Sequence, residues 1–374
     1  MVRAGMVDSG GVTVREPYHA VVLPRNRAIR RGSWRSMRAA DGHAFHVWSH
    51  SMSNRAIARR DFLKHASTLT AAAAAFGLGG NEGSARAQEG RRPADPARGA
   101  TAPQFSLAHL TVLGCAPPEM TYIAARAGYD FVSFRLIYMG LPGEANYDVA
   151  RNPEMLRQTK TALTATGLKL LDIEVARISD GLDPKAYLPS MEAAAELGGK
   201  YVLASGWAGD RQFTIDCYGQ LCDLARPLGL TVVLEFVTFA TVKTLADALA
   251  VVRGAGRSNS GILVDTLHFS RSRVAPAELD ALPRALLPYA HLCDAPAEIP
   301  SANEGLIATA REARLYPGEG GIDLAAIVGR LPPVPYSLEI PHLARVKEIG
   351  YTEHAFRCLQ HAKSFLAAHP RPRA

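Results

Sequence analysis

Four apolar segments in the second half of the chain carry a carboxylate or an imidazole near one end. The residues are Glu235, Asp265, His291 and Glu339, in the segments 231–236, 261–265, 289–293 and 335–340. A carboxylate inside an apolar segment is costly unless it is paired or bound to a cation. Three carboxylates and one imidazole suit Mn²⁺, Mg²⁺, Co²⁺ or Zn²⁺. The residue types therefore predict a divalent-metal site, if the fold brings the four segments together.

Other polar residues hold similar positions in the sequence. His268 follows the third segment, Glu174 ends an earlier apolar segment at 168–174, and Arg135 ends another at 130–135. Taken singly, each residue could also have a purely structural role, since a strand-end glutamate often anchors a loop and a histidine often lies on the surface. Their joint occurrence at matching segment ends is what favours a functional site, with Glu174 and Arg135 as substrate-binding residues.

The elements that must position these residues alternate along the chain from Phe105 onward. Short apolar runs predict strands at 105–112, 130–135, 168–174, 200–204, 231–236, 261–265, 289–293 and 335–340. Amphipathic stretches predict helices at 117–127, 153–166, 184–198, 212–227, 241–253, 276–287, 322–330 and 351–367. Glycines such as Gly128, Gly167 and Gly229 end several helices just before a strand.

Eight such units predict an α/β fold, a (β/α)₈ TIM barrel that forms a single domain over 105–370. The alternative is a doubly wound open sheet, which usually has a Gly-rich phosphate loop after its first strand. The segment after the first predicted strand of this chain is Leu113-Gly114-Cys115-Ala116-Pro117-Pro118, which is not such a loop. Because active sites of TIM barrels lie at the carboxyl ends of the strands, the barrel is the fold that gathers the candidate ligands.

The N-terminal region reads as an export leader. Arg59-Arg60-Asp61-Phe62-Leu63-Lys64 matches a twin-arginine signal, an apolar run spans 66–78, and 85–87 fits a cleavage site. The run is too short to span a bilayer, so we expect no stable membrane anchor. We expect a signal peptide at 52–87, a linker at 88–104, and a mis-called or disordered extension at 1–51. The twin-arginine translocase would be a partner during export, and the protein would be periplasmic or secreted.

Charge and cysteine content exclude some classes of protein. Residues 1–87 hold 13 Lys and Arg against 5 Asp and Glu, whereas residues 88–374 hold 29 against 30. The net charge of +7 therefore belongs to the leader, and nothing predicts a nucleic-acid partner. Five cysteines in an exported chain do not make a complete disulfide framework, although Cys217 and Cys222 remain one possible pair. A homo-oligomer is also left open.

Four motifs resemble those of the xylose isomerase-like barrel family of sugar phosphate isomerases and epimerases. They are Val264-Asp265-Thr266-Leu267-His268, His291-Leu292-Cys293-Asp294, the segment 317–323 (PGEGGID) and Ser337-Leu338-Glu339. The resemblance covers about 105–367. The motifs are fairly specific to the superfamily and not to a substrate.

The resemblance implies a metal bound by Glu235, Asp265, His291 and Glu339, with the two glutamates as the catalytic acid and base. It also implies that His268 contacts substrate oxygen near the metal. Two further residues, Arg314 and Glu319, would line the substrate side. The zinc ligands that the nuclease branch of the family adds are not evident in this chain.

Chemistry of this kind begins with removal of a proton from a carbon next to a carbonyl group. We therefore expect an isomerase or epimerase that acts on a sugar or a related hydroxy-carbonyl compound. A lyase or dehydratase of the same fold shares this first step, as in dehydration of an inosose or β-elimination from a keto-glycoside. A non-catalytic periplasmic binding protein is the third hypothesis, and the presence of both glutamates disfavours it.

Overall fold

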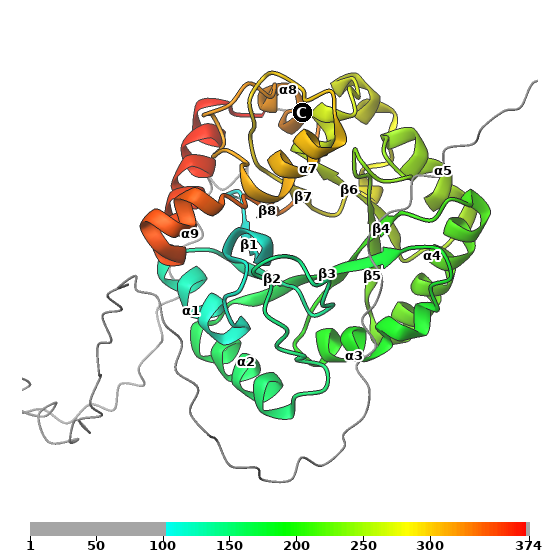
Figure 1. Cartoon of the computed structure of the whole chain (residues 1–374), viewed down its shortest axis with the longest axis horizontal. Coiled ribbons are helices and arrows are strands. Elements are labelled where there is room, and N and C mark those ends of the chain that lie inside the picture. The colour runs from blue at the N-terminus through cyan, green and yellow to red at the C-terminus, as the bar shows by residue number, and fades with distance from the viewer. Residues whose placement is uncertain (1–101, 372–374) are drawn as a thin grey trace, which may run out of the picture. The chain divides into compact units, whose positions relative to one another are not determined.

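Short apolar runs form the parallel strands of a closed barrel in residues 102–371, the part of the chain that the computed structural model describes (Figure 1). The strand order is β1 to β8, and β8 closes on β1 with Phe105 opposite Tyr336. The predicted TIM barrel is confirmed, and closure excludes the open sheet. The predicted extension, signal peptide and nearly all of the linker lie outside the described residues.

The strands are short, and their order along the chain is their order around the barrel. Their bounds are β1 Phe105–Ala108, β2 Phe131–Phe134, β3 Lys169–Ile178, β4 Tyr201–Gly206, β5 Thr231–Glu235, β6 Ser260–Asp265, β7 Ala290–His291 and β8 Tyr336–Leu338. Helices surround the strands (Figure 1). Their bounds are α1 Pro117–Ala127, α2 Pro153–Thr166, α3 Leu188–Glu196, α4 Arg211–Ala225, α5 Leu245–Ala255, α6 Thr266–Arg271, α7 Asn303–Glu312, α8 Leu324–Val328 and α9 Leu343–Ala368.

Capping residues explain where several helices begin and end. Asn152 and Asp210 accept hydrogen bonds from the first turns of α2 and α4. Gly128 and Gly167 end α1 and α2 in the left-handed conformation, with φ of 91° and 73°, which glycine adopts without strain. These glycines were predicted to end helices, and they do.

The largest differences from the prediction lie in three helical segments. The helix after β6 begins at Thr266 because the Asp265 carboxylate caps it, while 276–287 contains only short 3₁₀ helices, Pro276–Ala281 and Arg284–Leu286. Proline cannot donate a backbone hydrogen bond, which disfavours a continuous helix there. The α7 helix was not predicted. The last helix begins at Leu343 and is kinked at Gly350, where φ is 75°.

The barrel interior has an apolar half below the carboxyl ends of the strands. Val233, Leu263 and Tyr289 belong to one buried cluster, and each lies two residues before a predicted metal ligand. Because side chains alternate along a strand, these residues and the ligands share the inward face. The five cysteines are buried and free, so Cys217 and Cys222 form no disulfide.

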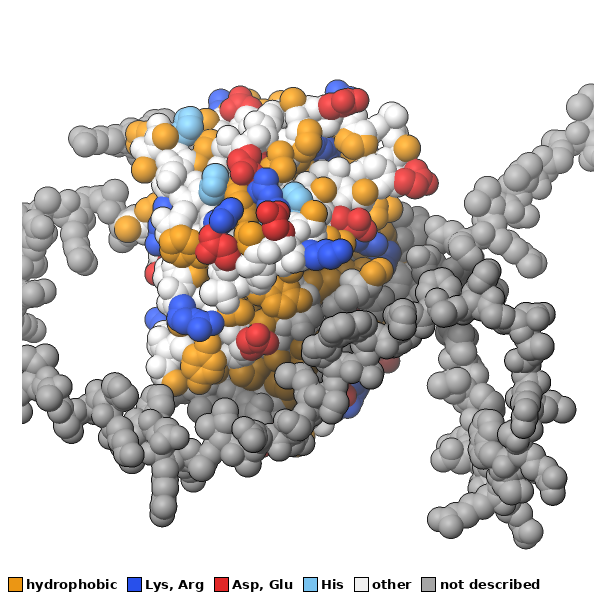
Figure 2. Space-filling view, turned by 60° about the vertical axis from the view of Figure 1, so that its left-hand side comes forward, with side chains coloured by type: hydrophobic (Ala, Val, Ile, Leu, Met, Phe, Trp, Pro, Cys, Tyr) orange, Lys and Arg blue, Asp and Glu red, His pale blue; other side chains and the backbone are white. Residues whose placement is uncertain are grey.

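The surface of the barrel mixes charges of both signs. Figure 2 shows acidic and basic side chains interspersed with apolar ones on the face that it draws. Among residues 102–371, no helix combines the length and the apolar composition that crossing a membrane requires.

Candidate metal centre

The four predicted ligands lie together at the carboxyl ends of β5 to β8. Glu235, Asp265 and His291 are the last residues of β5, β6 and β7, and Glu339 follows β8 directly. Adjacent parallel strands bring these ends to one rim of the barrel, as the pairing of Asp265 with His291 illustrates. One ligand atom from each residue lies within 4.8 Å of the others.

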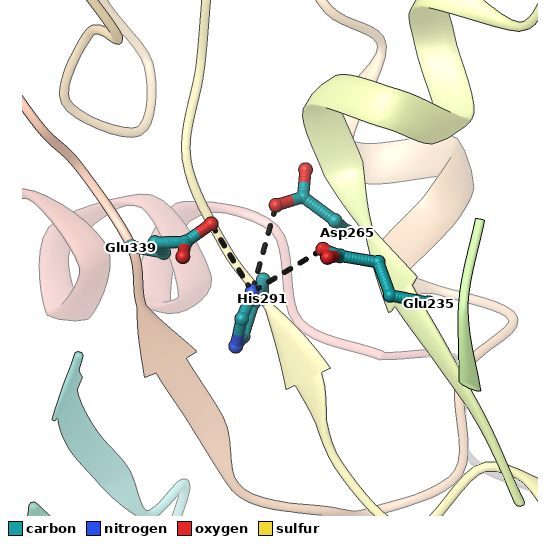
Figure 3. A group of neighbouring side chains, drawn as sticks. All are labelled: Glu235, Asp265, His291 and Glu339. Carbon is teal, nitrogen blue, oxygen red and sulfur yellow. Dashed lines mark ion pairs between the residues drawn. The ribbon is translucent and has the colours of Figure 1, made fainter. Parts of the chain in front are cut away.

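His291 occupies the centre of the group (Figure 3). Its Nδ1 atom lies 3.7 Å from Glu235 Oε1, 3.6 Å from Asp265 Oδ2 and 3.3 Å from Glu339 Oε2. Ligands about 2.1 Å from one ion are separated from each other by about 3–4 Å. The spacing of the four side chains is therefore that of a ligand set that a cation draws together with small movements.

Polar atoms without partners point to the same conclusion. Among the described residues, Glu235 Oε1 and both ring nitrogens of His291 are buried and form no hydrogen bond. Such atoms are costly in a folded protein unless a cation, a water molecule or a substrate satisfies them. An imidazole nitrogen with three carboxylate oxygens suits Mn²⁺, Mg²⁺, Co²⁺ or Zn²⁺, so the residues present fit a divalent metal.

Within residues 102–371, Arg314 supplies the one guanidinium that is ion-paired with this group. Its Nη1 atom lies 2.6 Å from Asp265 Oδ2, and its Nη2 atom lies 2.8 Å from Glu339 Oε2. The side chain is 2% exposed, and its Nε donates to the Ala310 carbonyl at 2.8 Å. Three carboxylates with one guanidinium leave a net charge of −2, which a divalent cation balances. Arg314 was predicted to line the substrate side, and the structure places it directly against two candidate ligands.

Burial and neighbouring charges shift the pKa values of the two glutamates in opposite directions. Burial raises the pKa of Glu235 to about 7. Burial also raises the pKa of Glu339, but the positive charges of Arg314 and His291 together lower it by more, so the net shift is downward. Burial lowers the pKa of His291, yet the Glu339 charge and the close approach of all three carboxylates raise it well above its usual range. The site therefore favours positive charge among its carboxylates.

His268 lies on α6, one turn after the Asp265 cap. Its backbone N–H donates to Asp265 Oδ1 at 3.2 Å, and its Nδ1 lies 3.1 Å from the Thr238 hydroxyl. Burial lowers the pKa of His268 to about 4, so its ring is neutral at ordinary pH. If the Thr238 hydroxyl donates to Nδ1, Nε2 carries the proton and is available as a hydrogen-bond donor.

Glu174 and Arg135 come from the part of the barrel that β2 and β3 form. Arg135 directly follows β2, whereas Glu174 lies within β3, which was predicted to end at 174 and continues to Ile178. Both oxygens of Glu174 are buried without a hydrogen bond. Burial, followed by the Glu339 charge, raises the pKa of Glu174 well above its usual range. Arg135 is ion-paired with Glu144 at 3.3 Å, and its charge acts on Glu174 in the opposite direction. The charges of Arg135 and Glu339 thus both act on the buried Glu174 carboxyl, which has no hydrogen-bond partner of its own.

Glu319 does not join the cluster. Its carboxylate pairs with Arg345 at 2.8 Å, and both side chains are about one quarter exposed or more. The loop that carries it folds around Asp294, whose carboxylate accepts backbone hydrogen bonds from Gly318, Gly320 and Ile322 at 3.0–3.2 Å. The sequence predicted Glu319 on the substrate side, whereas the structure gives its carboxylate a partner on α9.

Aromatic side chains form one wall beside the cluster. Phe239 packs edge-on against His268 with ring centres 5.6 Å apart, and its ring centre lies 5.8 Å from that of Trp207. The Arg177 guanidinium lies 3.7 Å from the centre of the Trp207 ring. Phe239 was not predicted from the sequence, because a single phenylalanine in a loop carries no sequence signal.

Two buried residues below the ligands were also not assigned a role from sequence. Asp172 precedes Glu174 by two residues on β3, and Tyr289 precedes His291 by two residues, directly before β7. Both are almost completely buried. This spacing of two was the available signal, since it predicts a shared strand face with a known candidate.

Comparisons with known proteins agree with the geometry. The profile of a family described as "Xylose isomerase-like TIM barrel" matches residues 122–361. The inosose isomerase of Bacillus velezensis is 29% identical over 175 residues, which are 44% of this chain and 54% of that protein. The 3-dehydroshikimate dehydratase of Pseudomonas aeruginosa is 28% identical over 261 residues, 63% of this chain and 38% of that protein. The chain thus spans about half the length, or less, of these relatives.

Solved structures share the fold at low sequence identity. The IOLI protein with a bound zinc atom has a TM-score of 0.59 and is 20% identical, with 71% of this chain and 99% of that chain covered. The D-allulose 3-epimerase of Methylomonas sp. has a TM-score of 0.53 and is 17% identical, with 70% and 96% covered. At these identities the likeness concerns the fold alone.

Proposed function

Because this chain belongs to the xylose isomerase-like TIM barrel family, we propose that it is a divalent-metal-dependent isomerase or epimerase. Its substrate would be a sugar or a related hydroxy-carbonyl compound, and the reaction would begin with proton removal from the carbon next to the carbonyl group. The enzymes of this fold among the relatives are an isomerase, an epimerase and a dehydratase, which supports chemistry of this class.

One observation carries the proposal. Glu235 and Glu339 lie on either side of His291 at the barrel rim, and each has a carboxylate oxygen within 3.7 Å of its Nδ1 (Figure 3). A pair of carboxylates that converge from two strands on one point can remove a proton from one face of a substrate carbon and return it to the other. A divalent metal bound by Glu235, Asp265, His291 and Glu339 would polarise the carbonyl and hydroxyl oxygens of the substrate.

The two glutamates are suited to different tasks. The pKa of Glu235 is raised by burial to about 7, so this carboxyl can gain and lose a proton near neutral pH. The net shift in the pKa of Glu339 is downward because the charges of Arg314 and His291 together outweigh burial, so this carboxylate stays ionised and ready to accept a proton. Arg314 holds Glu339 in place through a contact of 2.8 Å.

Neighbouring residues are arranged to orient the substrate. The neutral His268 ring, held by Thr238, would donate its Nε2 proton to a substrate oxygen. Glu174 and Arg135 would bind hydroxyl groups further from the reacting carbon, because the carboxylate oxygens of Glu174 have no hydrogen-bond partner. Phe239 and Trp207 would exclude water on the side of β4 and β5.

A dehydratase is the second candidate. The 3-dehydroshikimate dehydratase of Pseudomonas aeruginosa matches a larger share of this chain, 63%, than the inosose isomerases do. Elimination of water begins with the same proton removal and then expels a hydroxyl group from the adjacent carbon. Glu235 and Glu339 would serve it equally well, with one as the base and the other as the acid that protonates the leaving group.

Product analysis separates the two candidates. The purified protein is incubated with Mn²⁺ and with ketoses, inososes and 3-keto-glycosides in turn, and the products are followed by NMR. An isomerase or epimerase yields a product of the same mass as its substrate, whereas a dehydratase yields an unsaturated product with loss of water. No turnover of any compound with any of the four metals would refute both candidates and would favour the binding protein.

The metal and the compartment are further parts of the proposal. The zinc in the IOLI protein belongs to that protein, and we propose Mn²⁺, Mg²⁺, Co²⁺ or Zn²⁺ here. Elemental analysis of the protein as purified identifies the metal. We also propose export by the twin-arginine translocase, which moves folded chains, so that the metal is bound before the protein leaves the cytoplasm.

A further inference from the structure

A layer of buried polar side chains lies below the metal centre, on the side of the barrel that β1, β2, β3 and β8 form. Ser106 and Ser133 are hydrogen-bonded at 2.9 Å, Ser133 lies 3.4 Å from Ser337, and Ser133 donates to Asp172 Oδ1. All four side chains are completely buried. Interiors of such barrels are usually filled by branched apolar residues, so a polar layer here has a cost that calls for a function.

The layer adjoins His291. Ser337 is opposite His291 in the β7–β8 register and opposite Ser106 in the β1–β8 register. Tyr289, which directly precedes β7, has its ring centre 5.9 Å from the imidazole of His291. The Asp172 carboxyl is therefore connected to the neighbourhood of His291 from two sides, through the serines and through Tyr289.

Three buried polar atoms in this region have no hydrogen-bond partner. They are Asp172 Oδ2, the Tyr289 hydroxyl and His291 Nε2. Burial raises the pKa of Asp172 to about 6, whereas the nearby His291 charge and the Ser133 and Tyr289 hydroxyls act to lower it. An acceptor, a hydroxyl and a ring N–H in one buried region satisfy one another directly or through a single water molecule, which needs two to four polar partners.

A histidine that binds a metal through one nitrogen almost always donates its other N–H to a carboxylate, a carbonyl or water. In His291 the Nδ1 atom faces the three carboxylates, so Nε2 must carry the proton. The Oδ1 atom of Asp172 is already bound by Ser133, which leaves Oδ2 for a second contact.

We propose that Asp172 is a positioning residue that accepts the Nε2 proton of His291, directly or through one water molecule shared with the Tyr289 hydroxyl, and so fixes the ring orientation and tautomer in which Nδ1 binds the cation. This inference rests on the proposed function. In this arrangement the serine layer holds the Asp172 carboxyl so that it faces the imidazole.

Metal affinity tests the proposal without reference to activity. The dissociation constant for Zn²⁺ is measured by chelator competition in the wild-type protein, in Asp172→Asn and in Glu174→Gln. Glu174 is the matched control because it is a buried carboxyl on the same strand that lacks a hydrogen bond. We expect Asp172→Asn to weaken zinc binding by about 10–100-fold, the usual effect of removing an outer hydrogen-bonding partner, and Glu174→Gln to weaken it by less than about threefold.

The outcomes separate this proposal from the proposed function. A wild-type protein that binds no metal refutes the proposed function, and this inference with it. Tight binding by the wild type with equal losses in the two variants means that Asp172 acts only through its charge, which refutes this inference alone.

NMR of the wild-type chain gives a second test if Asp172→Asn does not fold. In zinc-loaded protein with ¹⁵N-labelled histidine, the Nε2–H signal of His291 is assigned by its absence in His291→Gln. We expect a slowly exchanging proton shifted downfield by a carboxylate acceptor, and Tyr289→Phe should increase its exchange rate. Protonation on Nδ1, or a rapidly exchanging Nε2 proton, would overturn the proposal.

Discussion

At the scale of single residues, the charge balance of the metal centre depends on Arg314. Its guanidinium contacts Asp265 and Glu339 while lying almost completely buried. A buried ion pair adds little to stability when intact, but loss of one partner leaves an uncompensated charge. Arg314 therefore keeps Asp265 and Glu339 ionised in the metal-free protein. A bound metal would take over part of that role.

Replacement of Arg314 by methionine should expose this dependence. In Arg314→Met we expect the metal-free protein to lose about 3–5 kcal/mol in the free energy of unfolding, because two buried carboxylates lose their cation. The metal-saturated protein should lose less. Urea denaturation with and without Mn²⁺ measures both values. The control is Arg157→Met, whose pair with Glu154 is exposed and whose loss should leave stability nearly unchanged. Equal losses with and without metal would contradict this account.

The raised pKa values of Glu235 and His291 give metal binding a pH dependence. Below about pH 7, Glu235 holds a proton in the metal-free protein, and His291 holds one as well, since its pKa is also raised. A cation must displace these protons, so we expect affinity to fall as the pH falls below about 7. Calorimetry in two buffers with different ionisation enthalpies measures the protons released.

The same groups make the metal-free protein less stable at higher pH. The pKa of Glu235 lies above its ordinary 4.5, so its contribution is present below pH 4.5 and is lost as the pH rises to about 7. The His291 contribution is lost in the same direction, above pH 6.5. In Glu235→Gln the decline in melting temperature in EDTA between pH 5 and 8 should be shallower. An unchanged decline would exclude Glu235 as its source.

The sequence predicted which side chains form the candidate metal site, but it did not predict all of the contacts that neighbouring charged residues make. Glu235, Asp265, His291 and Glu339 could be predicted because each stands at a strand end, and strand ends meet. The contacts of Arg314 could not, since a long flexible side chain in a loop can turn either to solvent or to the interior. For the same reason the pairing of Glu319 with Arg345 on α9 was not foreseen.

At the scale of elements, the loop between α7 and α8 is built around one carboxylate. Asp294 accepts backbone hydrogen bonds from Gly318, Gly320 and Ile322, and a Cβ at Gly320 would lie 2.3 Å from Asp294 Oδ1. The glycine is therefore needed for the close approach. This arrangement fixes the segment that follows Arg314.

Loss of the Asp294 carboxylate should loosen this loop selectively. In Asp294→Ala we expect a loss of about 2–4 kcal/mol, because hydrogen bonds to a charged acceptor are among the stronger ones. Amide hydrogen exchange at Gly318, Gly320 and Ile322 should accelerate, while that of β3 to β5 should not. The comparison variant is Asp323→Ala, which removes only the cap of α8. Uniform acceleration throughout the barrel would contradict a local role.

Element boundaries show where sequence patterns stop being informative. The helix caps at Gly128 and Gly167 were predicted because glycine reports a left-handed turn. The start of α6 at Thr266 was not, since Asp265 acts both as its cap and as a candidate ligand, and a pattern search assigns such a residue one role. The short β7 was predicted longer, because its apolar neighbours are buried in the barrel without pairing as strand.

At the scale of the whole molecule, the closed barrel bears on when a metal could be bound. A metal site assembled from the ends of four strands exists only after the barrel has closed. Export of the folded chain would let the cytoplasm determine which metal is bound. The twin-arginine motif itself, at Arg59 and Arg60, lies outside the described residues and stays a prediction.

Export can be tested with the leader alone. We expect residues 52–88, fused to a reporter that is active only if it folds before translocation, to direct it to the periplasm. Replacement of both Arg59 and Arg60 by lysine should abolish export, measured by fractionation. The control replaces Arg55, which lies outside the motif, and should have no effect. Export that persists in the double variant would exclude the twin-arginine route.

The central claim is that Glu235 and Glu339 move a proton at a carbon beside a carbonyl group in a metal-dependent reaction. The most direct measurement is exchange of substrate protons with deuterium from the solvent, followed by NMR in metal-saturated and EDTA-treated protein and in Glu235→Gln. Exchange at that carbon that requires the metal and falls by at least about 100-fold in Glu235→Gln is the predicted result. Exchange that persists at the wild-type rate in Glu235→Gln, with metal bound, would contradict the account.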